Sequence, residues 1–95
     1  MAIRVLFRVD AAREIGAGHV MQCLCLAEAL RAVGHVCHFL CRRREGDLIA
    51  AIESRGFDCT VLSSREPVPP DCAWLGSTLT EEIKQARAAV AAEMP

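Results

Sequence analysis

The residues best suited to chemistry stand together in the stretch IGAGHVMQ, at positions 15–22. Gly16 and Gly18 flank one small residue, and His19 follows them directly. Glycines let a backbone approach a ligand closely and adopt a positive φ. A neutral imidazole can accept a proton near pH 7. The pattern therefore indicates a ligand-binding loop with a candidate proton acceptor beside it.

A helix-like pattern begins at Gly18, directly after this loop. The first amides of a helix are unpaired and carry partial positive charge, which suits a phosphate or a sugar hydroxyl. The same dipole disfavours an imidazolium and so favours a neutral His19. A dinucleotide-binding fingerprint would need a third glycine near position 21, where the chain has Met21. The pattern thus disfavours an NAD site, and a histidine that only caps the helix or lies on the surface is the structural alternative.

The segments around the loop alternate between strand and helix patterns. Apolar or alternating runs predict strands over 3–9, 36–41 and 59–63, and longer periodic runs predict helices over 18–33, 46–56 and from Thr78 to near Met94. We expect helix 18–33 to bury the stripe Cys23, Leu26, Leu30 and Val33, and the last helix to make its contacts through Leu79, Ile83, Val90 and Met94. Thr78 and Glu81 fit a capping box.

This order of elements predicts an α/β fold with a parallel three-stranded sheet core and flanking helices. Ligands in such folds lie beyond the carboxyl ends of the strands, and residues 10–18 follow the first strand at such an end. Arg42, Arg43 and Arg44 follow the second strand and are a second candidate for phosphate contact, with a solvated loop as the alternative.

Composition narrows the class of protein. The 95 residues are 53% hydrophobic with a net charge of −1, which suits a globular chain and gives no attraction to nucleic acid or to an anionic membrane. No apolar run reaches the roughly 18 to 20 residues of a membrane span, and Arg4 and Arg8 interrupt the first apolar stretch as no signal peptide would. We therefore expect a cytoplasmic protein without a membrane partner.

The cysteines are expected to be reduced and structural, since most fall at apolar positions of predicted elements. They stand at 23, 25, 37, 41, 59 and 72. Cys37 and Cys41 would lie about 13 Å apart along one strand, too far to share a zinc ion. We therefore expect no metal. His35 and His38 are expected to be structural as well.

Residues 8–30, RVDAAREIGAGHVMQCLCLAEAL, carry a family resemblance. The stretch resembles the start of the bacterial UDP-2,4-diacetamido-2,4,6-trideoxy-β-L-altropyranose hydrolases of pseudaminic acid biosynthesis. These begin with a strand, then R-x-D, a few small residues, I-G-x-G-H and a Leu/Ala-rich helix. The likeness continues weakly through CRRREGDLIAAI, GFDCTVLSS and the WLG near Trp74. Related spore-coat polysaccharide proteins begin similarly.

The resemblance implies a two-domain glycosyltransferase-B fold whose N-terminal domain is Rossmann-like. It also implies a reaction without metal or cofactor, in which water attacks the anomeric carbon of a UDP-sugar and UDP leaves with inversion. It maps the catalytic histidine onto His19 and the loop facing the sugar and diphosphate onto Gly16 and Gly18. Arg8 and Asp10 match the R-x-D positions among the substrate-binding residues, with Asp10 expected to order the loop.

Two departures from the family pattern bear on function. Gln22 stands where the family has a basic residue. Either the contact with the anionic substrate is weaker, or the position tolerates an uncharged residue. We expect Gln22 to face the cleft. Residues 1–95 match only part of the N-terminal domain, and the C-terminal UDP-binding domain is absent, so we expect the chain alone to be inactive. The alternatives are a related sugar transferase, in which His19 deprotonates an acceptor hydroxyl, and a non-catalytic α/β module that forms a homodimer through its open sheet edge.

Overall fold

The computed structural model describes residues 2–13, 15–62 and 77–93. The elements follow the order β1 (Arg4–Arg8), α1 (Gly18–Ala32), β2 (Val36–Arg42), α2 (Ile49–Ser54), β3 (Asp58–Leu62) and α3 (Leu79–Glu93). The predicted alternation of strands and helices is therefore confirmed. Cys72, Trp74 and Met94 lie outside the described residues.

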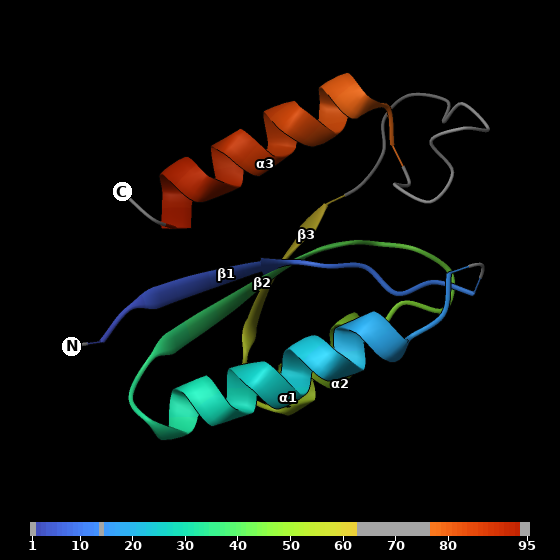
Figure 1. The fold of residues 1–95 in the computed structure, drawn as a ribbon. Helices are drawn as coiled ribbons and strands as arrows, with labels where there is room; N and C mark the ends of the chain where they lie inside the picture. The colour runs from blue at the N-terminus through green and yellow to red at the C-terminus, as the bar shows by residue number, and fades with distance from the viewer. Residues whose placement is uncertain (1, 14, 63–76, 94–95) are drawn as a thin grey trace.

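The strands form a parallel sheet in the order β1-β2-β3. Helices α1 and α2 cover one face of this sheet, and α3 lies over the other face (Figure 1). This confirms an α/β fold with a three-stranded parallel sheet and flanking helices. The carboxyl ends of the strands meet at the edge from which the loops lead into α1 and α2, where a ligand is expected in this class of fold.

Helix α2 is shorter than the predicted 46–56. Gly46 has a φ of 82°, which is not helical. The carboxylate of Asp47 accepts hydrogen bonds from the amides of Arg44 at 2.8 Å and Ile49 at 3.2 Å. These bonds hold the preceding residues in a turn, so the helix begins only at Ile49. The sequence pattern did not separate this turn from the helix.

The main core lies between the sheet and the helices α1 and α2. Its centre is Phe39 of β2, whose ring stacks on Phe7 at 5.0 Å between centroids and lies 5.5 Å from Phe57. The buried members of this core are Val9, Ala11, Val20, Leu24, Ala27, Cys37, Phe39, Cys41, Ile49, Ile52 and Phe57. The spacing of Leu48, Ile49 and Ile52 predicts that they face inward, and this is confirmed: Ile49 and Ile52 are buried in this core, and Leu48 packs against it half-buried.

The predicted stripe of α1 is wrong in two of its four residues. Leu26 is 53% exposed and Val33 is 71% exposed, whereas Val20, Leu24 and Ala27 are buried. The helix is apolar on most of its circumference, so its sequence period gives little information about its orientation.

Helix α3 also presents a different face from the predicted one. A small apolar cluster of Leu40, Leu62 and Ala89, with Leu6 against it, joins the helix to the sheet. Leu79, Ile83 and Val90, expected as contacts, are exposed. The expected cap at the start of the helix is present, since Thr78 Oγ1 accepts the amide of Glu81 at 3.2 Å.

The described cysteines are free thiols: Cys23, Cys25, Cys37, Cys41 and Cys59. Cys37 and Cys41 are buried in the main core, while Cys25 lies exposed on the outer side of α1. None of the described helices has both the length and the apolar character needed to cross a membrane.

Candidate functional site

The loop between β1 and α1 closes on itself before the helix begins. Gly16 N donates to the carbonyl oxygen of Ala12 at 2.7 Å, and the amide of Ala12 donates back to Gly16 O at 3.4 Å. Gly16 has a φ of 80°, a conformation that other residues rarely adopt. A glycine at this position is therefore required by the turn that delivers the chain to α1.

Helix α1 begins without a side-chain cap. Ala17 is its N-cap residue and has no side-chain acceptor, the described residues give no side-chain cap, and the first turn contains no acidic residue. The helix ladder starts with Met21 N donating to Ala17 O at 3.1 Å. The first amides, from Gly18 to Val20, are thus left for a ligand or water, and they carry the partial positive charge of the helix end.

His19 stands in this uncapped first turn, and its side chain is exposed. Gln22 is also exposed and follows three residues later, so the two side chains are neighbours on the helix surface. A methyl group added at Gly18 would meet no atom within 4 Å, and Gly18 has no positive φ. Gly18 therefore leaves open space at the helix end, but the backbone does not demand it.

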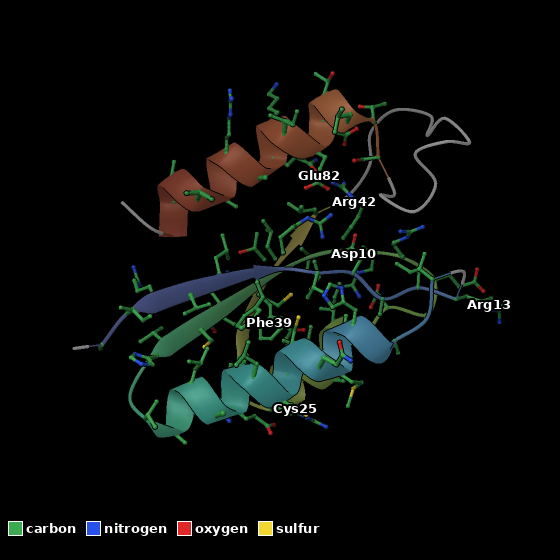
Figure 2. All side chains as sticks on the ribbon, in the orientation of Figure 1. Asp10, Arg13, Cys25, Phe39, Arg42 and Glu82 are labelled. Atoms are coloured by element: carbon green, nitrogen blue, oxygen red, sulfur yellow. The ribbon has the colours of Figure 1, made fainter. Side chains whose placement is uncertain are left out.

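A second loop, between β2 and α2, is fixed against the first. Arg13 N donates to Glu45 O at 2.8 Å, and their side chains form an exposed ion pair at 3.0 Å. A Cβ on Gly46 would lie 2.8 Å from the backbone nitrogen of Arg13, so only glycine allows this approach. The two loops at the carboxyl end of the sheet thus form one surface, with Arg13 on its rim (Figure 2). Sequence reasoning missed the role of Gly46, although its place in the short connection EGD was a signal for a turn.

Arg8 and Asp10 belong to a different arrangement, on the face of the sheet covered by α3. The guanidinium of Arg8 donates to Glu82 at 2.9 and 2.6 Å and to Asp10 at 2.7 and 3.0 Å. Arg42 donates through Nη2 to Glu82 at 3.0 Å and to Gln85 at 2.8 Å. We call these five residues the α3 network (Figure 2).

Asp10 also ties the ends of two strands together, because its Oδ1 accepts the backbone amide of Arg42 at 2.7 Å. Arg42 ends β2 and its side chain is only 1% exposed, so it does not lie in a solvated loop. Its Nε and Nη1 find no acceptor among the described atoms. Arg43, by contrast, is exposed beside Asp47.

The hydrogen bonds of the α3 network shift the pKa values of Glu82 and Arg8. Burial acts to raise the pKa of Glu82, but the hydrogen bonds from Arg8 and Arg42 outweigh it and lower that pKa below its ordinary value. Burial acts to lower the pKa of Arg8, and its bonds to Glu82 and Asp10 more than reverse this. These shifts keep the Arg8 guanidinium and the Glu82 carboxylate charged at neutral pH.

The structure thus separates the predicted site residues into two sets. Gly16, Gly18, His19 and Gln22 lie at the start of α1, which covers one face of the sheet. Arg8 and Asp10 turn toward α3 on the opposite face. The sequence offered no sign that Glu82, far along the chain, would be the partner of Arg8.

The other polar clusters have structural partners. His35 Nδ1 accepts the amide of Ile3 at 3.1 Å, and His38 Nε2 lies 2.7 Å from Thr60 Oγ1. Arg4, His38 and Asp58 help to line a pocket of about 60 Å³ at the amino ends of the strands. This pocket lies at the opposite end of the sheet from the loop that leads to His19. Across the residues with described positions, no three His, Cys, Asp or Glu side chains gather as a metal site would require.

Comparisons with protein-family models, with characterised proteins and with solved structures find no match to this chain.

Proposed function

We propose that the chain is the N-terminal part of a nucleotide-sugar hydrolase that releases UDP from a UDP-diacetamido-trideoxyhexose during surface polysaccharide biosynthesis. The observation that carries this proposal is the exposed His19 in the uncapped first turn of α1, directly after the Gly16 turn. This position lies at the carboxyl end of a parallel sheet, where α/β folds bind ligands. The likeness of residues 8–30 to the start of such hydrolases supplies the substrate class.

In the proposed reaction His19 accepts a proton from a water molecule. The water oxygen forms a bond to the anomeric carbon from the side opposite the diphosphate. The bond between that carbon and the phosphate oxygen breaks, and its electron pair leaves with UDP. The sugar is released with inverted configuration, and His19 returns its proton to solvent. A base positioned on water contributes about 10²–10⁴-fold to such reactions.

The uncapped amides of α1 supply the electrostatic part of the proposal. They place several N–H donors and the positive helix end beside His19, where they can bind the diphosphate or a sugar hydroxyl. Gln22 adds an uncharged donor and acceptor one turn further along. The proposed chemistry uses no metal and no cofactor.

Arg8 and Asp10 have an indirect part in this proposal. The guanidinium of Arg8 donates to Glu82 and to Asp10, and the carboxylate of Asp10 also accepts the amide of Arg42. They hold the end of β1 against β2, and so fix the point from which the Gly16 turn departs. Direct contact between Arg8 and a phosphate would require loss of its bonds to Glu82.

The arrangement of helices on both faces of the sheet suits the Rossmann-like half of a glycosyltransferase-B fold. In that proposal a C-terminal domain binds most of the nucleotide, in the cytoplasm. The 95-residue chain alone should then bind UDP-sugar weakly and release no UDP. Robust UDP release by the purified chain, lost in His19→Ala, would show that this half is sufficient.

Protection of histidines from diethyl pyrocarbonate tests where the ligand lies. The reagent acylates accessible imidazoles, and mass spectrometry locates each product. Millimolar UDP-sugar should slow the modification of His19 while leaving the rates at His35 and His38 unchanged. Equal protection of all three histidines, or of none, would contradict the proposed site.

A further inference from the structure

The backbone of Arg13 is held beside the start of α1. Arg13 lies in the turn that the two hydrogen bonds between Ala12 and Gly16 close, shortly before the helix. Its amide donates to Glu45 O at 2.8 Å, and the backbone of Gly46 comes so close that a Cβ there would lie 2.8 Å from Arg13 N. Figure 2 shows Arg13 at the end of the molecule where α1 begins. The position of its Cα is therefore fixed, while its exposed side chain can change direction.

Arg13 is the only cation of the segment that carries the candidate site. Residues 9–30 contain no other lysine or arginine. The next cation, Arg31, stands in the last turn of α1, where its Cζ lies 4.1 Å from the centroid of the Phe57 ring. The uncapped first amides of α1 carry only the partial charge of the helix end. Within this segment, only Arg13 can therefore give a full positive charge to an anionic group bound at the start of α1.

Other arginines at the carboxyl end of the sheet are tied elsewhere. Arg8 and Arg42 belong to the α3 network, on the opposite face of the sheet. Arg43 follows β2, and its amide donates to Leu62 O of β3 at 2.8 Å, on the side of β2 away from β1. Arg13, by contrast, lies in the loop that leads from β1 directly into α1.

The side chain of Arg13 has a partner that it can exchange. Its Nη1 lies 3.0 Å from Oε1 of Glu45, and both side chains are more than three-quarters exposed. Such an exposed pair contributes little to stability. A phosphate group offers the same guanidinium a bidentate, charge-assisted hydrogen bond, which is stronger. An anion at the start of α1 can therefore draw Arg13 away from Glu45 without moving the backbone of either loop.

We propose that Arg13 binds the diphosphate of the nucleotide sugar, and that Glu45 is the partner which the diphosphate displaces. This inference rests on the proposed function, in which the diphosphate lies at the uncapped amides beside His19. The guanidinium adds a full charge to the partial charges of those amides. Because a ligand must compete with the Glu45 carboxylate, an uncharged sugar does not engage Arg13. The residue therefore selects for the charged part of the ligand.

Amide shifts in nuclear magnetic resonance spectra, with inorganic pyrophosphate as the probe at low ionic strength, test this role. The shifts of Gly18 and His19 give the dissociation constant. Arg13→Gln should raise it about fivefold, because a charge-assisted hydrogen bond is lost while the exposed pair no longer has to be broken. Glu45→Gln should lower it about twofold, because the competing carboxylate is removed.

A second exposed ion pair supplies matched controls. Arg55 Nη1 lies 3.3 Å from Oε1 of Glu28, and the two side chains are 38% and 43% exposed. Arg55→Gln and Glu28→Gln change the net charge by the same amounts as the two test variants. Both controls should leave the dissociation constant unchanged, because Arg55 follows the end of α2 and lies far from the loop of Arg13. Equal effects of Arg13→Gln and Arg55→Gln would mean that only net charge matters, and would overturn the proposal.

Two results separate this role of Arg13 from the proposed function. Equal dissociation constants for the wild type and Arg13→Gln, with clear shifts at Gly18 and His19 in both, would overturn the role of Arg13 and leave the anion site in place. A wild-type chain in which pyrophosphate shifts neither amide would overturn both. Arg13→Lys keeps the charge without the bidentate geometry, so its dissociation constant should lie between those of the wild type and Arg13→Gln. Tighter binding by the lysine variant than by the wild type would refute the bidentate contact.

Discussion

Neutralising Glu82 should destabilise the fold, because this one carboxylate joins α3 to two strands. It accepts two bonds from Arg8 and one from Arg42 at 2.6–3.0 Å. In Glu82→Gln, the new amide oxygen can still accept a hydrogen bond, but the almost fully buried Arg42 loses its one carboxylate partner among the described residues. Breaking a buried pair costs about 3–5 kcal/mol. We expect about 3 kcal/mol, the low end of that range, because Asp10 still neutralises Arg8.

Urea unfolding at pH 7, followed by far-ultraviolet circular dichroism, measures this cost. A small domain has a free energy of unfolding of only about 5–15 kcal/mol, so a loss of 3 kcal/mol is easily resolved. Glu45→Gln is the matched control, because the pair between Glu45 and Arg13 is more than three-quarters exposed. An exposed pair contributes about 0–1 kcal/mol. Equal losses in the two variants would refute the idea that the α3 network fixes α3 to the sheet.

The stability contributed by Glu82 should depend on pH. The pKa of Glu82 is lower in the folded chain than its ordinary value of 4.5. Its contribution is therefore complete above pH 4.5 and is lost as pH falls through the folded pKa. As pH is lowered below 4.5, the free energy of unfolding should therefore decrease less in Glu82→Gln than in the wild type. Parallel pH profiles for the two proteins would contradict this assignment.

Two further predictions concern the backbone and the thiols. Gly46→Ala should destabilise the chain more than Gly34→Ala: both residues have a positive φ, which costs roughly 1–2 kcal/mol for alanine, but only Gly46 would place its Cβ against Arg13. Equal midpoints in urea would contradict this contact between the two loops. Cys25 should react with iodoacetamide in the native chain, whereas Cys41 should react only on unfolding, because hydrogen bonding with Cys59 and burial raise the pKa of its thiol. Mass spectrometry of timed samples checks this order, and early labelling of Cys41 would contradict its burial.

The order of elements was predictable from local patterns. Strand and helix periods are local. Helices α1 and α2 end at Ala32 and Ser54, within two residues of the predicted ends, and each is followed by a glycine with a positive φ, Gly34 or Gly56. The position of Gly16 and His19 at a strand-to-helix junction follows from the same local order. The sequence alone therefore predicts the fold class and the junction at which the candidate site lies.

The orientation of the helices was not predictable from the same patterns. Helix α1 is apolar nearly all round, so contact with the sheet, rather than its period, decides that Leu26 is exposed. In helix α3, Glu82 faces the sheet because it accepts hydrogen bonds from Arg8 of β1 and Arg42 of β2. The neighbouring Ile83 is therefore exposed to solvent. These ion pairs join residues far apart in the sequence, and they decide which face of α3 meets the sheet. The spacing of residues within α3 therefore does not predict the orientation of the helix.

Mapping of backbone amide shifts in nuclear magnetic resonance spectra, with UDP-sugar added to millimolar concentration, tests the central claim most directly. The account predicts weak, saturable shifts at Gly16, Gly18 and His19, and little change at Arg8 or Glu82. Largest shifts around Arg8 and Glu82, or in the pocket beside His38, would place the ligand elsewhere and contradict the account.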